Sequence, residues 1–459
     1  MKNYSVFSML AIVACIFLAS CSKSSEVLSS IPASSPVVAR IDLDKAADAF
    51  DIKMNGDGIV LPEYLKDILG QRLADNQQNV KKLCSSVDRQ NMYMFASKND
   101  YIITCLLTDV KTFKSVLTDS GYECRHIDGF DVYNIVSSSL LIRDNQIWIF
   151  DSGNADSAVT AVKAQLKLAE EKSLADVDYA ADAICSNNTV DLLVDMEATS
   201  AITNCMYHAA INAKGNTLEM NTKMIGTKEA IDSLKAIYAC QKIGDKLKIN
   251  APENALFVAA MGIKGDYDWS TRFEQSGAML PYQAMAMLQA AAPILKAIDG
   301  TVSIVVTTAD LNSLIGNLAP SLNISVRAMA KEGAVLELKQ HFADMFAKMA
   351  LKGIEQGDKV VYETGLFRAS IGCEGNILCI DFATPTAPTS EATVNMTDKF
   401  EKYDAAVMLN IPSLSDFQGL NVPYGLTITG NGSFEKASFK ATLTGTDGKF
   451  FPTIYNSFK

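Results

Sequence analysis

The cysteine at position 21 has the setting that most clearly predicts chemistry. It closes the segment Leu18–Cys21, which follows an apolar stretch that starts at Met9 behind the basic Lys2. A charged start, an apolar middle and a small-residue end are typical of a secretory signal peptide. We expect cleavage before Cys21 and attachment of lipid to its thiol. Residues 1–20 are then removed, and Cys21 is an anchor rather than a catalyst.

Residues 21–35, which begin at Cys21, are rich in serine and contain few apolar side chains. Such a composition buries too little surface to offset the entropy of folding. The sequence therefore predicts an unstructured tether between the anchor and the folded part of the chain.

Other residue types give no catalytic or metal-binding pattern. The three histidines, His126, His208 and His341, have no second ligand at a spacing such as H-E-x-x-H. The chain also lacks G-x-S-x-G, a P-loop and a dinucleotide-binding fingerprint. We expect no metal, no cofactor and no catalytic residue, which favours a noncatalytic protein over an enzyme.

The charge of the chain excludes some classes of partner. Its formal net charge is -11 and its isoelectric point is about 4.9. A nucleic-acid-binding protein usually carries a basic patch, and contact with anionic lipid usually needs a polybasic segment. We expect no nucleic-acid partner, and membrane attachment only through lipid on Cys21.

Apart from the lipidated Cys21, eight cysteines remain in the mature chain, and they show neither C-x-x-C nor a metal-like cluster. An even number permits disulfides in an oxidising compartment, but the connectivity is open. The alternative, which we favour, is that most are buried free thiols that behave as small apolar side chains. They are Cys84, Cys105, Cys124, Cys185, Cys205, Cys240, Cys373 and Cys379.

The first half of the chain is echoed by the second half in the same order. Gly58–Pro62 corresponds to Gly277–Pro281, and Gly226-Thr227 corresponds to Gly445-Thr446. Between these landmarks, alternating apolar runs and short turns predict hairpins in matching places. The predicted hairpins are Met92–Leu107 and Ile324–Leu338, Val132–Asp151 turning at Asp144-Asn145 and Leu366–Phe382 turning at Gly375-Asn376, and Tyr207–Thr227 and Gly425–Thr446.

Amphipathic helices follow the first hairpin of each half. One carries Phe113, Val116 and Leu117, and the other carries Phe342, Met345, Phe346 and Met349, at the spacing of one helical face. Insertions at 154–181 and 308–322 interrupt the match between the halves.

These patterns predict an α+β fold of two tandem similar lobes, each a mainly antiparallel sheet with helices packed on one face. The lobes cover residues 36–245 and 246–459, and a helix over 228–243, capped by Thr227, joins them. A cleft between the lobes is the expected place for a ligand.

The stretch Met279–Ile298 is apolar almost all round and rich in methionine. It is interrupted by prolines and glutamines, so it is not expected to span a membrane. A buried core helix is one interpretation. The wall of an apolar groove, which would make the protein a carrier of apolar ligands, is the other.

The start of the mature chain resembles a family of uncharacterised lipoproteins from Bacteroidetes, of similar length. The resemblance rests on the lipobox at Cys21, the serine-rich segment, Ile31-Pro32 and the run Val37–Leu43. In such lipoproteins an acidic run after the lipidated cysteine marks export to the cell surface, whereas here only Glu26 is acidic. The resemblance therefore implies an outer-membrane lipoprotein that faces the periplasm.

The resemblance also implies two short O-glycosylation patterns, around Ser157 and Ser233. It supplies no activity, because that family has no established catalytic residues.

The sequence leaves two classes of function. The favoured one is a membrane-anchored lipoprotein of the cell envelope, a noncatalytic domain of unknown function that binds envelope proteins or an apolar ligand. The alternative is a periplasmic hydrolase whose carboxylates meet in the cleft between the lobes.

Overall fold

The computed structural model describes residues 24–55, 58–62, 65, 77–96, 100–135, 137–185, 187–196, 204–268, 293–308, 321–388, 393–416 and 422–456. The signal peptide, Cys21 and most of Met279–Ile298 lie outside the described residues. The chain divides into two compact units. Unit 1 is Met1–Leu234 with Asp447–Lys459, and unit 2 is Lys235–Thr446.

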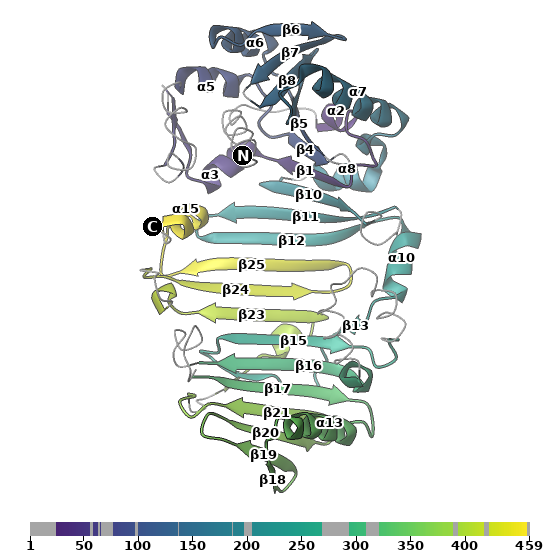
Figure 1. The fold of residues 1–459 in the computed structure, drawn as a ribbon, viewed down its shortest axis with the longest axis vertical. Helices are drawn as coiled ribbons and strands as arrows, with labels where there is room; N and C mark the ends of the chain where they lie inside the picture. Colours follow the sequence, from purple (N-terminus) through teal and green to yellow (C-terminus); the bar gives the residue numbers. More distant parts are fainter. Residues whose placement is uncertain are drawn as a thin grey trace. The chain divides into compact units, whose positions relative to one another are not determined.

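Unit 1 is built on antiparallel strands that pair in the order β6-β7-β8-β9-β5-β4-β1-β10-β11-β12 (Figure 1). A separate hairpin joins β2 to β3. The strands are β1 Val37–Ile41, β2 Lys53–Asn55, β3 Gly58–Val60, β4 Met92–Ala96, β5 Tyr101–Leu106, β6 Cys124–Ile127, β7 Phe130–Ile135, β8 Ser138–Arg143, β9 Gln146–Phe150, β10 Val190–Asp195, β11 Cys205–Lys214 and β12 Thr217–Gly226.

Helices cover both faces of this sheet. Ile102 and Ile103, neighbours in β5, point to opposite faces and belong to different apolar cores. The core with Ile102 also takes side chains from α2, α7 and α8, and the core with Ile103 takes side chains from α6. The helices are α2 Ser24–Leu28, α3 Leu43–Ala49, α5 Gln77–Ser85, α6 Val110–Asp119, α7 Ala155–Glu171, η2 Leu174–Asp176, α8 Asp178–Ile184, α10 Lys228–Ala236 and α15 Phe450–Asn456.

Unit 2 has its own antiparallel strands, which pair in the order β18-β19-β20-β21-β17-β16-β15-β23-β24-β25. The strand β13 pairs with β15, and β14 pairs with β22 in a separate ladder. The strands are β13 Cys240–Gln241, β14 Asn250–Pro252, β15 Phe257–Ile263, β16 Ile298–Thr307, β17 Asn323–Ala330, β18 Gly353–Gln356, β19 Lys359–Glu363, β20 Arg368–Glu374, β21 Ile377–Ala383, β22 Thr393–Asn395, β23 Ala405–Ile411, β24 Gly425–Gly432 and β25 Lys436–Thr444.

Two apolar cores stabilise unit 2. One lies under α13, Val335–Lys348, which packs against β20 and β21 (Figure 1). The other is formed by β15, β16 and β23 with α14, Thr397–Phe400, and the loop around β14. Residues 293–297 are helical, and a short 3-10 turn, η4, covers Leu414–Asp416.

The mixed α and β class and the mainly antiparallel strands are confirmed. The hairpins predicted at Asp144-Asn145 and Gly375-Asn376 are present, with Arg143 opposite Gln146 and Glu374 opposite Ile377. The expectation of helices on one face only is wrong for unit 1, because the apolar residues of β5 supply a core on each side.

Three other expectations differ from the structure in their boundaries. The helix predicted over 228–243 begins as expected, with the N–H of Ala230 donating to Thr227 Oγ1 at 3.3 Å, but it ends at Ala236. The hairpin predicted over Ile324–Leu338 is a strand followed directly by α13. Phe342 and Phe346 of α13 pack on the core, whereas Met345 and Met349, the residue that follows the helix, are exposed.

The unstructured tether is a wrong prediction from residue 24 onward. Helix α2 places Val27 and Leu28 in the core of unit 1 beside Ile31, and none of the three is more than 1% exposed. Backbone bonds hold the segment in place, since the N–H of Leu174 donates to Ile31 O at 2.8 Å and that of Ala33 to Lys172 O at 3.0 Å. The serines are compatible with folding because three apolar side chains share one side of the segment.

Candidate functional site

Four neighbouring strands of unit 2, β19, β20, β21 and β17, present a polar face on the side opposite α13. Side chains of a strand alternate between faces. Tyr362, Ala369, Ile371 and Leu378 therefore lie in the core under α13, and the residues between them point the other way. We call this side the open face and define it by the residues Ser325, Arg327, Lys359, Val361, Arg368, Ser370 and Asp381.

The strand register aligns these residues in a row. Val361 lies opposite Ser370, Ser370 opposite Asp381, and Asp381 opposite Ser325. Residues directly opposite each other have Cβ atoms about 5 Å apart. A ligand on this face would therefore meet hydroxyl and carboxylate groups from three adjacent strands.

The centre of the open face is a fixed polar group. Ser325 Oγ donates to Oδ1 of Asp381 at 2.9 Å, and Nη2 of Arg327 lies 2.7 Å from the same oxygen. Nη1 of Arg327 donates to the carbonyl oxygens of Val326 at 2.9 Å and Ile380 at 3.3 Å. These bonds hold the guanidinium in one orientation over the sheet.

Two adjoining pockets follow the open face, with volumes of about 300 Å³ and 410 Å³. Both are lined by Asp381 and Ala383. The smaller also contains Gln356, Lys359, Arg368 and Ser370, and the larger extends to Asn250, Asn254, Thr307 and Thr393. Ligand pockets commonly have volumes of about 300 to 1,000 Å³.

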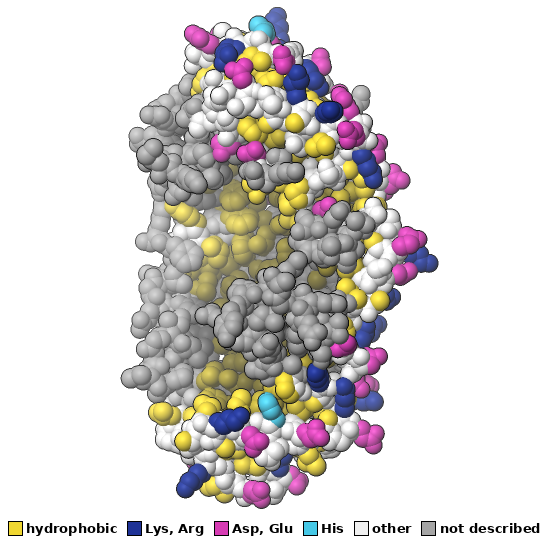
Figure 2. Space-filling model, turned by 45° about the vertical axis from the view of Figure 1, so that its right-hand side comes forward, with side chains coloured by type: hydrophobic (Ala, Val, Ile, Leu, Met, Phe, Trp, Pro, Cys, Tyr) yellow, Lys and Arg dark blue, Asp and Glu magenta, His cyan; other side chains and the backbone are white. Residues whose placement is uncertain are grey.

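The open face is more basic than the chain as a whole. Lys359 and Arg368 form no ion pair with any other described residue, whereas Arg327 is paired with Asp381. On the face of the molecule that Figure 2 shows, basic and acidic side chains of the described residues are interspersed. Two unpaired cations beside a neutral ion pair favour a ligand that carries negative charge.

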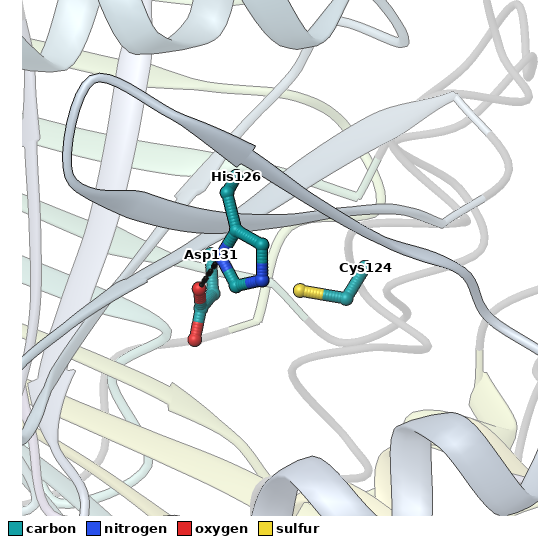
Figure 3. Close-up of side chains that lie close together, drawn as sticks. All are labelled: Cys124, His126 and Asp131. Carbon is teal, nitrogen blue, oxygen red and sulfur yellow. Dashed lines mark ion pairs between the residues drawn. The ribbon is translucent and has the colours of Figure 1, made fainter.

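A second constellation lies on the hairpin of β6 and β7 in unit 1 (Figure 3). Cys124 and His126 are two residues apart on β6, so they share a face, and Asp131 lies directly opposite His126. One ligand atom from each of the three residues lies within 4.8 Å of the others. Nδ1 of His126 pairs with Oδ1 of Asp131, and Lys114 of α6 pairs with Oδ2.

The charges around Asp131 keep it ionised. Partial burial raises the pKa of its carboxyl, but the hydrogen bond and charge of Lys114, together with His126, outweigh the burial and hold the pKa below its ordinary value. The spacing of residues in the sequence did not reveal that Cys124 and Asp131 lie beside His126. The signals were the alternation of Cys124 with His126 and the turn at Asp128-Gly129, where both residues have positive φ and form a two-residue hairpin loop.

The histidine of β11 has different surroundings. His208 Nε2 lies 2.9 Å from Oδ1 of Asp191, which is fully buried and pairs with Arg40 at 3.0 Å. Asn188 also donates to Asp191 Oδ1, at 2.8 Å. This network joins β1, β10 and β11 inside unit 1, and its role is structural.

Carboxylates gather at one further place in unit 1. Burial raises the pKa of Asp44, nearby Arg89 lowers it in part, and the charges of Asp42 and Asp88 raise it further. Arg89 Nη1 lies 3.2 Å from Asp44, and Asp42 caps α3 by accepting from the N–H of Lys45. Asp42, Asp44 and Asp88 do not line either of the two pockets at the open face. A carboxylate hydrolase site in a cleft between lobes stays a prediction.

A third pocket of about 470 Å³ lies in unit 1 beside the N-terminal segment. It is lined by Ala33, Ser34, Pro36, Lys172, Val177, Tyr179, Asp195, Asn204, Cys205 and Met206. Burial raises the pKa of the Cys205 thiol, so the buried cysteine offers a protonated and unreactive group.

In the part of the chain that the structure describes, the eight cysteines after Cys21 form no disulfide. Cys84, Cys105, Cys205 and Cys379 are buried, but Cys124 and Cys185 are exposed. Burial raises the pKa of Cys105 and Cys379, which agrees with the expectation of small apolar thiols at these positions.

The predicted modification sites are placed as follows. Ser157 lies in the first turn of α7, where its N–H donates to Asn154 Oδ1 at 3.1 Å. Ser233 lies within α10 and donates to the carbonyl oxygen of Glu229 at 2.8 Å. Both side chains are exposed. Cys21 is outside the described residues, so lipidation and O-glycosylation stay predictions.

No helix of the described residues is long and apolar enough to cross a bilayer. No protein-family model and no curated protein matches the chain.

Proposed function

We propose that the protein is a lipid-anchored, noncatalytic binding protein of the cell envelope, and that it holds a polar, negatively charged ligand on the open face of unit 2. The observation that carries the proposal is the partly exposed polar row through Ser370, Asp381 and Ser325, with two adjoining pockets.

The strand orders of the two units support duplication of one ancestral lobe. The strand order β6-β7-β8-β9-β5-β4-β1-β10-β11-β12 of unit 1 corresponds strand by strand to β18-β19-β20-β21-β17-β16-β15-β23-β24-β25 of unit 2. Helices α6 and α13 also occupy the same place along the chain. Helix α6 lies between β5 and β6, and α13 lies between the corresponding strands β17 and β18. Two tandem similar lobes are the simplest interpretation of this correspondence.

The same position in the two units has opposite chemistry. Phe150 is the fifth residue after the turn of the β8–β9 hairpin, and Asp381 is the fifth after the turn of the β20–β21 hairpin. Phe150 lies opposite Ile102, and Asp381 lies opposite Ser325. Phe150 and Ile102 are buried in the core that includes α7 side chains, whereas the side chain of Asp381 is 35% exposed.

The cover differs for a reason visible in the sequence. Helix α7 lies within the insertion 154–181 of the first half. In unit 2, the described residues after β21, 384–388, form no helix. Side chains that a helix covers are shielded from water and are therefore apolar, whereas side chains of an uncovered face contact water and are polar. We infer that the first lobe closed this face with α7, whereas the described residues of the second lobe leave the corresponding face free for a ligand.

The anchor and the location follow from the N-terminus. Lipid on Cys21 attaches the chain to a membrane, and the resemblance to Bacteroidetes lipoproteins favours the outer membrane with the protein facing the periplasm. The ligand is an anion of the carboxylate or phosphate class, because Arg and Lys recognise both groups.

Calorimetric titration of the mature protein with citrate and with inorganic phosphate tests the ligand class. We expect heat of binding for at least one of them, and a loss of about tenfold in affinity for Arg368→Ala and for Lys359→Ala. Lys348→Ala, an exposed basic residue on α13, is the matched control and leaves the affinity unchanged. Equal weakening by all three variants, or no heat with either anion, contradicts the proposed ligand class.

A further inference from the structure

We infer that Cys124 and His126 form a binding site for a divalent transition ion of the zinc class, with Asp131 as the residue that orients the imidazole. The site lies on the β6–β7 hairpin of unit 1 and is independent of the open face.

The hairpin supplies the geometry without help from distant parts of the chain. The turn at Asp128-Gly129 sets the register that places Asp131 opposite His126. Cys124 lies two residues before His126 and therefore on the same face of β6. Three potential ligands therefore come from eight consecutive residues on one rigid element, and Figure 3 shows the three side chains converging.

The contacts assign a role to each group. Nδ1 of His126 is taken by Asp131, and its other ring nitrogen points towards the sulfur of Cys124 (Figure 3). Metal-binding histidines commonly donate one ring N–H to a carboxylate, which fixes the tautomer and leaves the second nitrogen for the metal. Oδ2 of Asp131 is occupied by Lys114, so Asp131 supports His126 rather than binding the ion itself.

The donor atoms favour zinc. Thiolate sulfur and imidazole nitrogen are the ligands that zinc prefers, with distances of about 2.3 Å and 2.0 Å and roughly 3.5 Å between two ligand atoms on one ion. The atoms here lie within 4.8 Å of one another, a separation that small side-chain rotations close. His126 is 80% exposed, so water can complete the coordination shell.

The corresponding hairpin of unit 2 provides an internal comparison. Strands β18 and β19 also join through a two-residue turn, but Glu355 lies opposite Val360, and Gly353 takes the position two residues before Glu355. This hairpin has no sulfur or imidazole ligand. The hairpins therefore predict one zinc ion per chain rather than two.

Zinc titration of the reduced mature protein against a chromophoric indicator tests the inference. We expect one equivalent, with an affinity that falls at least tenfold in Cys124→Ser and in His126→Ala. For Asp131→Asn we expect a loss of about 10-fold to 100-fold, as for other residues that orient a ligand. Matched controls are Cys185→Ser, the other exposed thiol, and His341→Ala, an exposed histidine of unit 2; both keep the wild-type affinity.

Cobalt(II) gives a second readout that a structural role would not change. The wild-type protein should show a sulfur-to-cobalt charge-transfer band in the near ultraviolet, and Cys124→Ser should lack it while its circular dichroism stays that of the wild type. The inference is overturned if the band persists in Cys124→Ser, or if the controls lose as much affinity as the ligand variants.

Discussion

Arg327 and Asp381 form an ion pair between adjacent strands of unit 2, with 2.7 Å between Nη2 and Oδ1. Their side chains are 27% and 35% exposed, so water and salt screen the attraction. Exposed pairs contribute about 1 kcal/mol or less. The pair therefore orients groups on the open face more than it stabilises unit 2.

A double-mutant cycle with Arg327→Ala and Asp381→Ala measures this contribution. We expect a coupling energy of about 0.5 kcal/mol at low salt, which decreases as salt is added. Urea unfolding of the four proteins gives the value. A coupling of several kcal/mol, or one that salt does not change, would mean that the pair is a structural element rather than part of a binding surface.

The buried charge network of unit 1 should behave in the opposite way. Asp191→Ala leaves the buried guanidinium of Arg40 without its counter-charge, and the expected cost in unfolding free energy is about 3 to 5 kcal/mol. Asp182→Ala, an exposed position in α8, is the control and should change stability by less than about 0.5 kcal/mol. Similar urea midpoints for the two variants would contradict the structural role of Asp191.

The N-terminal segment should contribute to the stability of unit 1. Ile31→Ala removes a fully buried side chain and is expected to cost about 2 to 5 kcal/mol. Glu26→Ala changes an exposed residue of the same segment and should have little effect. If thermal unfolding shows no difference between Ile31→Ala and the wild type, the segment is a tether after all.

The cap that follows the end of α7 predicts a dependence on pH. The hydroxyl and the backbone N–H of Ser173 donate to Oδ2 of Asp176 at 2.7 Å and 2.8 Å, and these bonds hold the pKa of Asp176 below its ordinary value. A carboxyl with a lowered pKa in the folded state stabilises the protein above its unfolded-state pKa. That contribution is lost as the pH falls through the folded-state pKa.

Asp176→Asn should therefore be less stable than the wild type at neutral pH, and the difference should vanish in acid. Urea midpoints of both proteins across the acid range measure the difference. Ser173→Ala should reproduce the effect at neutral pH. A gap that stays constant from neutral to strongly acid pH would show that the carboxylate charge plays no part.

Much of the strand arrangement could be predicted from the sequence because two-residue turns fix the register locally. Asp144-Asn145 and Gly375-Asn376 mark their hairpins directly. The start of α13 gave no such signal. The residue before it, Ala334, has no capping side chain, and Gly333, with φ of +79°, ends the strand in a turn that also suits a hairpin.

The proposed binding surface could not be predicted, because alternation along a strand does not say which face of the sheet a helix covers. Ser325 and Asp381 are ordinary polar positions of a half-buried strand until the absence of a helix between 384 and 388 is known. The cluster at Cys124 was detectable in principle. It required combining a period of two along β6 with the cross-strand register that Asp128-Gly129 imposes.

If Cys21 carries lipid as proposed, the packed N-terminal segment limits how far unit 1 can lie from the membrane. Only Ser22 and Lys23 separate Cys21 from the first residue of α2, and an extended chain advances about 3.5 Å per residue. With acyl chains on Cys21, a linker of about 10 Å connects unit 1 to the membrane, which is much shorter than a tether over the whole range 21–35 would be. On this proposal the N-terminal edge of unit 1 stays close to the lipid headgroups, because the linker before α2 is only two residues long.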